Sequence, residues 1–218
     1  MYSLELIMSE KSALTPPKAL SRSAQKYQAI VDAAEQVFID QGFQKANMDT
    51  IAQVANVSKR TVYNHFSNKN ELFHHILQSC CDDLYTSTQL PYQPDQALNK
   101  QLLHMLSKEW NLYTSDRFVK LARIVIGEYA NTPHFIEQFI AHEKSQQRGL
   151  QHWLSDAIAD QRIADIDTRF AYDFLNGSIK AFAHDPLLFD QAKPDERQKN
   201  FILNEVISMF LQRYERSS

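Results

Sequence analysis

The segment from residue 42 to residue 73, GFQKANMDTIAQVANVSKRTVYNHFSNKNELF, constrains the fold of this chain most strongly. It predicts two short helices joined by a tight turn, followed by the start of a third helix. Asn47 and Ser58 are suited to begin the two short helices, because their side chains accept hydrogen bonds from free backbone N–H groups. Asn56 and Val57 form the predicted turn. Val62 and Phe66 are four residues apart and mark the buried face of the second helix.

The other face of this second helix is rich in hydrogen-bond donors. Its residues are Lys59, Arg60, Thr61, Tyr63, Asn64 and His65. A short helix with one apolar edge and one donor-rich edge fits the major groove of DNA. Arg or Lys matches guanine and Asn matches adenine, so Lys59, Arg60 and Asn64 are candidates for reading sequence. Asp49 is expected to serve the N-terminus of the first short helix rather than DNA.

The stretch IAQVANVSKRTVYNHFSNKNELF resembles the helix-turn-helix signature of TetR/AcrR-family transcriptional regulators. The residues in register are Ile51, Ala52, Ala55, Val57, Ser58, Thr61, Tyr63, His65, Phe66, Lys69 and Leu72. Asn56 stands where the family usually has Gly. Asn tolerates a left-handed backbone better than most residues, so we expect the turn to survive.

The resemblance implies roles for several residues around this motif. Thr61 and Tyr63 match positions that contact phosphates or base edges, and His65 matches one that touches the DNA backbone. Lys69 is expected to reach a phosphate beside a helix N-terminus. The complete set of expected DNA-binding residues is Arg22, Lys26, Asn47, Lys59, Arg60, Thr61, Tyr63, Asn64, His65 and Lys69.

Long periodic segments with few chain breakers predict an all-α fold of about nine helices. The chain has only 4 Gly and 7 Pro among 218 residues. We expect a flexible tail over 1–20, a helix-turn-helix domain over 21–70, and a helical effector-binding and dimerisation domain over 71–218. Beyond the two short helices, the pattern predicts helices over 22–41, 68–89, 94–113, 116–130, 133–159, 167–183 and 195–214, with irregular structure over 184–190.

Charge is distributed unevenly along the chain. The stretch from Lys18 to Lys69 has seven Lys or Arg residues and four acids, a local charge of +3, whereas the whole chain is −3. The remainder therefore carries −6. A mildly basic end on an acidic body is typical of a DNA-reading domain attached to a part that does not touch DNA.

Other chemistry finds little support in the sequence. Cys80 and Cys81 are the only cysteines, which suits a reducing cytoplasm. Apolar runs are too short for a membrane span. The histidines lack the spacing of a metal site, and no nucleophile elbow, phosphate-binding loop or carboxylate pair occurs. We therefore expect no enzyme activity, no cofactor, no metal and no membrane partner.

The stretch RFVKLARIVIGEYANTPHFIEQFIAHEKSQQRGLQHWL resembles the AefR-like C-terminal domain found in part of the TetR family. This resemblance covers about 117–190 and gives no ligand identity. The TetR-family resemblance implies a ligand pocket among the helices expected over 68–183. Candidate lining residues are His104, Trp110, Tyr113, Phe118, Tyr129, Trp153 and Phe174. For any one of these aromatic residues, ordinary core packing is the competing interpretation.

The last two predicted helices carry more apolar residues than one buried face requires, so we expect them to form a dimer interface as a four-helix bundle. The interface candidates are Phe170, Phe174, Gly177, Phe182, Phe201, Val206, Phe210 and Tyr214.

The expected protein is a homodimeric repressor that binds double-stranded DNA and is released by a small-molecule effector. The alternative is a DNA-binding architectural or partner protein of the same fold without an effector.

Overall fold

The computed structural model describes residues 21–131, 137 and 149–216, which form ten α-helices. The predicted all-α fold is confirmed, and within these ranges the backbone forms no strand beyond one isolated bridge between Ile163 and Glu215. No helix in the described ranges is both long and apolar enough to cross a membrane. The expected tail over 1–20 and most of the helix expected over 133–159 lie outside the described residues.

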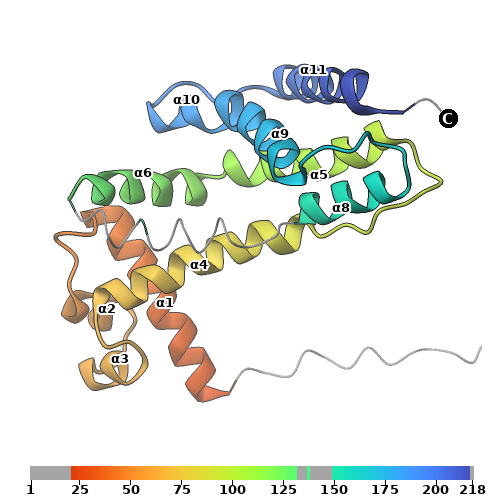
Figure 1. Ribbon diagram of the computed structural model, residues 1–218. Helices are drawn as coiled ribbons and strands as arrows, with labels where there is room; N and C mark the ends of the chain where they lie inside the picture. The colour runs from red at the N-terminus through yellow and green to blue at the C-terminus, as the bar shows by residue number, and fades with distance from the viewer. Residues whose placement is uncertain (1–20, 132–136, 138–148, 217–218) are drawn as a thin grey trace, which may run out of the picture.

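The first three helices form a compact group at one end of the molecule (Figure 1). They are α1 (Arg22–Gln41), α2 (Met48–Val54) and α3 (Lys59–His65). Gly42 ends α1 with φ of 77°, a conformation that is open to glycine and costly for most other residues. Asn56 adopts φ of 51° in the turn between α2 and α3, so the left-handed turn is present with Asn in place of Gly.

Side chains cap all three helices, and the caps of α2 and α3 are those that the sequence predicts. The Oδ1 atom of Asn47 accepts from the backbone N–H of Thr50 at 2.9 Å, and the Oγ atom of Ser58 accepts from the N–H of Thr61 at 3.1 Å. Ser21 caps α1 in the same way through the N–H of Ala24. Each bond satisfies one of the free donors at a helix start, so these short helices begin at fixed residues.

Helix α4 (Lys69–Thr88) begins beside α2 and α3 and runs beneath α6, α5 and α8 in the view of Figure 1. The larger body contains α5 (Leu98–Tyr113), α6 (Asp116–Asn131), α8 (Gly149–Ala159), α9 (Thr168–Ala183), α10 (Asp185–Leu188) and α11 (Glu196–Tyr214). Two predictions need correction. The helix expected from residue 94 begins at Leu98, and the stretch 184–190 holds the one-turn helix α10, with a proline in its first turn, instead of being wholly irregular.

The buried apolar side chains of the described residues form two separate cores. The first joins α1, α2 and α3 to the N-terminal half of α4, as far as Cys80, and includes Leu121 of α6. The second is formed by α5, α8, α9 and α11, with Trp110 and Trp153 fully buried in it. Helix α4 therefore belongs to the first core through its N-terminal half, while its contacts with α5 and α8 connect it to the second.

Candidate nucleic-acid interface and pocket

Helix α3 is anchored by its apolar edge and exposes its donor-rich edge. Val62 is fully buried and Phe66 is 4% exposed, in contact with the first core. Tyr63 is 52% exposed, and Lys59, Arg60 and Asn64 are also exposed. The structure therefore brings the predicted reading residues together on one accessible helix, in a form that can enter a groove.

An aromatic junction fixes the orientation of α3 relative to α1 and α4. The ring of Tyr27 stacks on Phe66 at 5.3 Å and meets His65 edge-on at 5.6 Å. The Tyr27 hydroxyl lies 2.7 Å from Nε2 of His75 on α4. Burial raises the pKa of Tyr27 above its ordinary value, because it disfavours the charged phenolate. His65 is half-buried in this junction and has a packing role beside its expected contact with DNA.

Four other predicted contact residues lie at the start of α1, on α3 and at the start of α2. Arg22 and Lys26 are exposed at the N-terminal end of α1, which lies at the same end of the molecule as α3 (Figure 1). Thr61 is half-buried, and its hydroxyl lies 2.8 Å from that of Ser58. Asn47 is exposed but uses its Oδ1 atom as a helix cap, which leaves its amide N–H₂ group for a contact with DNA.

Lys69 has a structural role that the sequence did not predict. Its ammonium group donates to the carbonyl oxygens of Phe43, Gln44 and Ala46 at 2.8, 3.0 and 3.3 Å, and lies 4.6 Å from the centre of the Phe43 ring. An ammonium group has three N–H donors, and all three have acceptors here. Lys69 thus fastens the loop before α2, and its expected contact with a phosphate stays a prediction.

A mostly apolar cavity of about 310 Å³ lies among α4, α6, α9 and α10. Its walls include Leu77, Cys80 and Cys81 of α4, Phe118, Leu121, Ala122, Val125 and Ile126 of α6, and Leu188 of α10. Its polar groups are Lys180, His184 and Asp185, where α9 meets α10. Such a composition, apolar walls with a few grouped polar atoms, is typical of small-molecule sites.

His184 is the most buried polar group of this cavity, at 4% exposure. Its Nδ1 atom lies 3.1 Å from the carbonyl oxygen of Tyr113, and its ring packs edge-on against Phe118 at 5.2 Å. Burial lowers the pKa of His184 below its ordinary value, which favours the neutral imidazole. With Nδ1–H donating to Tyr113, Nε2 is the ring atom that can accept a hydrogen bond.

Comparison with known proteins identifies both parts of the chain. The family model described as bacterial regulatory proteins, tetR family, matches residues 30–76. The model described as the AefR-like transcriptional repressor C-terminal domain matches residues 100–216, more than half of the chain. The chain belongs to the TetR family. It is therefore a DNA-binding transcriptional regulator, and both resemblances inferred from the sequence are confirmed.

Individual relatives agree with this family. A TetR-family regulator from Pseudomonas syringae pv. tomato is 34% identical, with 88% of this chain and 98% of that chain covered and a TM-score of 0.74. A structure from Mesorhizobium loti has a TM-score of 0.77 over 90% of this chain and 100% of that chain, at 20% identity, which shows the fold. The transcriptional activator FasR of Mycolicibacterium smegmatis is 45% identical over 65 residues, which span 30% of this chain and 29% of FasR.

The residues expected to line a single ligand pocket are dispersed in this TetR-family protein. Phe118 lines the α4–α6–α9–α10 cavity and Tyr113 packs directly behind it at 5.3 Å. Trp110 is 1% exposed in the second core. His104 and Trp153 line a different pocket of about 340 Å³ between α5 and α8. Phe174 lies on the exposed face of α9, and the side chain of Tyr129 lies outside the described residues.

Sequence reasoning missed Cys80, Cys81, Lys180 and His184 as cavity residues of the regulator. Cys80 and Cys81 follow the apolar residues Phe73 and Leu77 at helical spacing, which signals only that they face inward.

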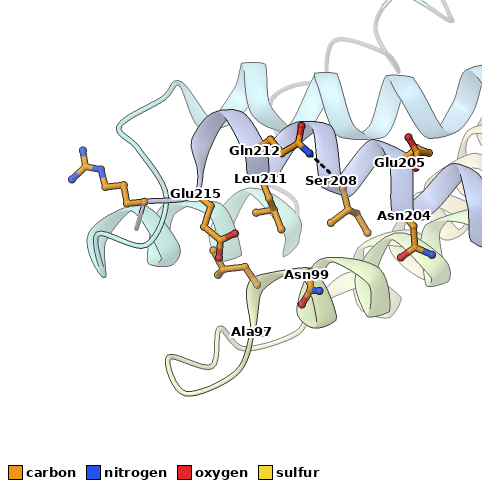
Figure 2. Close-up of a pocket in the computed structure, with 11 residues that line it drawn as sticks. Ala97, Asn99, Asn204, Glu205, Ser208, Leu211, Gln212 and Glu215 are labelled. Atoms are coloured by element: carbon orange, nitrogen blue, oxygen red, sulfur yellow. Dashed lines mark hydrogen bonds between the residues drawn. The ribbon is translucent and has the colours of Figure 1, made fainter. Parts of the chain in front are cut away.

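A third hollow, of about 860 Å³, lies between the N-terminal end of α5 and α11. Figure 2 shows that side chains such as Asn99, Asn204 and Gln212 line it. Asn99, Asn204 and Gln212 are exposed to solvent, so this pocket is a groove on the surface.

The expected dimer residues separate into an exposed set and a buried set. Phe170, Phe174, Phe182 and Phe201 are 55%, 41%, 51% and 66% exposed. A Cβ atom added at Gly177 would meet nothing within 4 Å, so this part of α9 is open to close approach. The prediction for Val206 and Phe210 is corrected, because these side chains are 7% and 1% exposed within their own chain. Tyr214 is half-buried against Phe210, and Met209 joins the exposed set at 59%.

Proposed function

We propose that this protein is a one-component repressor that binds a pseudo-palindromic operator as a homodimer and releases it when a small-molecule effector binds. We place it in the cytoplasm, where its DNA is. The exposed apolar residues of α9 and α11 are the proposed dimer surface, since an apolar face of this kind favours a partner. A two-fold dimer presents its two α3 helices to successive major grooves, about 34–36 Å apart.

One observation carries the effector part of this proposal: the walls of the apolar cavity are also supports of the DNA-binding helices. Helix α4 contributes Leu77 and Cys80 both to the cavity wall and to the core that packs α1, α2 and α3. Helix α6 contributes Phe118 to the cavity, and its Arg117 pairs with Glu35 of α1 at 2.8 Å. A ligand that changes the distance between α4 and α6 therefore changes the position of α3.

The proposed effector is a largely apolar small molecule. Most of the cavity wall is aliphatic or aromatic, and its volume of about 310 Å³ lies at the lower end of the range for ligand pockets. A polar group on the ligand would lie near Lys180 and His184. The presence of this cavity favours an effector-controlled regulator over the alternative of an architectural protein without an effector.

Arg60→Ala tests DNA reading by α3. Arg60 is exposed in the first turn of α3, where side chains reach base edges. If it reads a base, operator affinity should fall by about 1–3 kcal/mol, with a smaller loss on random duplex. Fluorescence anisotropy with both DNAs, over a range of salt, measures this difference.

The control is Lys100→Ala, which removes the same positive charge from an exposed position on α5. It should leave both affinities nearly unchanged. Equal losses for Arg60→Ala on operator and random DNA would mean that Arg60 contacts only phosphate. Absence of any sequence-dependent, salt-sensitive binding by the wild-type protein would remove the proposed function itself.

A further inference from the structure

An acidic residue is paired with a lysine on the surface proposed to meet DNA. The Nζ atom of Lys59 lies 2.5 Å from Oδ2 of Asp49. Lys59 is the first residue of α3, and Asp49 lies in the first turn of α2. Their side chains are 65% and 56% exposed. A carboxylate at this position repels phosphate, so its presence beside the recognition helix needs an explanation beyond DNA affinity.

The Lys59–Asp49 pair adds little to the stability of the fold. An ion pair between exposed side chains contributes only about 0–1 kcal/mol. The N-terminus of α2 already has Asn47 as its cap, so Asp49 adds only a small interaction with the helix dipole. The main physical consequence of Asp49 is therefore electrostatic, on the ammonium group of Lys59.

A lysine without a partner on a DNA-facing surface strengthens binding to every sequence equally. Each phosphate contact releases counterions and steepens the dependence of log K on log salt by about 0.9. Lys59 must leave Asp49 before it can contact a phosphate, and the carboxylate would then lie unpaired in the field of the DNA. A base edge carries partial charges only, so the ammonium group can donate a second N–H to it while it stays paired with Asp49.

We propose that Asp49 is a specificity-determining residue that acts through Lys59. It withholds the Lys59 ammonium group from phosphates on non-cognate DNA, while Lys59 in the operator complex is directed to a base edge. Asp49 thus lowers non-specific affinity more than operator affinity. The inference rests on the proposed function, because it requires that α3 reads an operator.

Asp49→Asn tests this inference, because it removes the charge and keeps the shape of the side chain. The probes are an operator selected by the wild-type protein from random duplexes and a scrambled duplex of equal length. The variant should bind scrambled DNA about threefold more tightly, with the salt slope steeper by about one. Operator affinity should change less, so the ratio of the two affinities should fall. Circular dichroism checks that the variant keeps its helix content.

Asp40→Asn is the matched control. Asp40 is exposed near the C-terminal end of α1, away from α3, and accepts a hydrogen bond from Gln36 at 2.7 Å. It should leave the affinity ratio unchanged. An equal rise on operator and scrambled DNA for Asp49→Asn, or the same result for both variants, would overturn the inference.

The Lys59→Gln background shows whether Asp49 acts through Lys59. In that background, Asp49→Asn should no longer change the affinity ratio. A full effect without Lys59 would mean direct repulsion of phosphate and would overturn the proposed route. Failure of the wild-type protein to select any operator would remove both proposals, whereas an unchanged ratio in a wild-type-like binder would remove this one alone.

Discussion

At the scale of single residues, Lys59 and Lys69 show how the environment decides what a charge does. Both belong to the helix-turn-helix segment, and both were expected to contact DNA. Lys59 remains exposed and pairs with a carboxylate, whereas Lys69 donates to three carbonyl oxygens of the loop before α2. The first is available to a ligand, and the second is part of the fold.

Replacing Lys69 by Met should therefore reduce stability. The Lys69→Met variant leaves three carbonyl oxygens of the 43–46 loop without their donor, which should cost about 1–3 kcal/mol in the free energy of unfolding. Urea denaturation followed by circular dichroism measures this loss. Lys45→Met, at an exposed position in the same loop, should change stability by less than about 0.5 kcal/mol. Equal stability of the two variants would contradict the structural role of Lys69.

At the scale of elements, α9 and α11 each have two apolar faces. Leu175 and Ile179 of α9, and Leu203 and Phe210 of α11, lie in the second core. Their other faces expose phenylalanines to solvent. The inner faces hold the domain together, so the outer faces are the ones available to a second copy of the chain.

The outer face of α9 predicts the effect of Phe182→Asp. Phe182 is 51% exposed, and a carboxylate there would be desolvated in a dimer but solvated in a monomer. The variant should shift the protein from dimer to monomer in analytical ultracentrifugation and weaken operator binding at least tenfold. Val54→Asp, at a 52% exposed position on α2, is the control and should leave the dimer intact. A dimer that survives Phe182→Asp would place the interface elsewhere.

At the scale of the whole molecule, α6 adds two polar contacts with the DNA-binding helices to the packing of Leu121 in their core. Arg117 pairs with Glu35 of α1, and Glu128 accepts from the side-chain amide of Gln44 at 2.5 Å in the loop before α2. Together with α4, these contacts fix the orientation of each DNA-binding unit on the body. In a dimer, that orientation sets the spacing of the two recognition helices.

Loss of the Arg117–Glu35 pair should make the distance between the two α3 helices of a dimer more variable. Arg117→Ala should weaken operator binding by about 1 kcal/mol, roughly fivefold in Kd. Without the pair, α3 of each subunit is less well ordered before binding, and ordering it reduces the binding free energy. Binding isotherms on operator DNA measure the change. Lys120→Ala, which removes an exposed positive charge from the same helix α6, should leave Kd unchanged. Similar losses for both variants would show that the α1–α6 contact does not orient α3.

The sequence alone determined the local features of this protein: the fold class, the capping of α2 and α3 by Asn47 and Ser58, and the two faces of α3. These depend on neighbours three or four residues away, so a linear pattern contains them. The same reasoning explains why the family resemblance could be recognised from one stretch of chain.

Only the tertiary structure decided how distant segments use these side chains. Phe201 and Phe210 are both apolar residues of α11, yet one is exposed and the other buried, because only the arrangement of α5 and α9 defines which face is covered. The cavity joins Cys80 of α4 to His184 at the end of α9, more than a hundred residues away in the sequence. Burial, cavity lining and the acceptors of Lys69 are relations between elements, and periodicity within one element does not contain them.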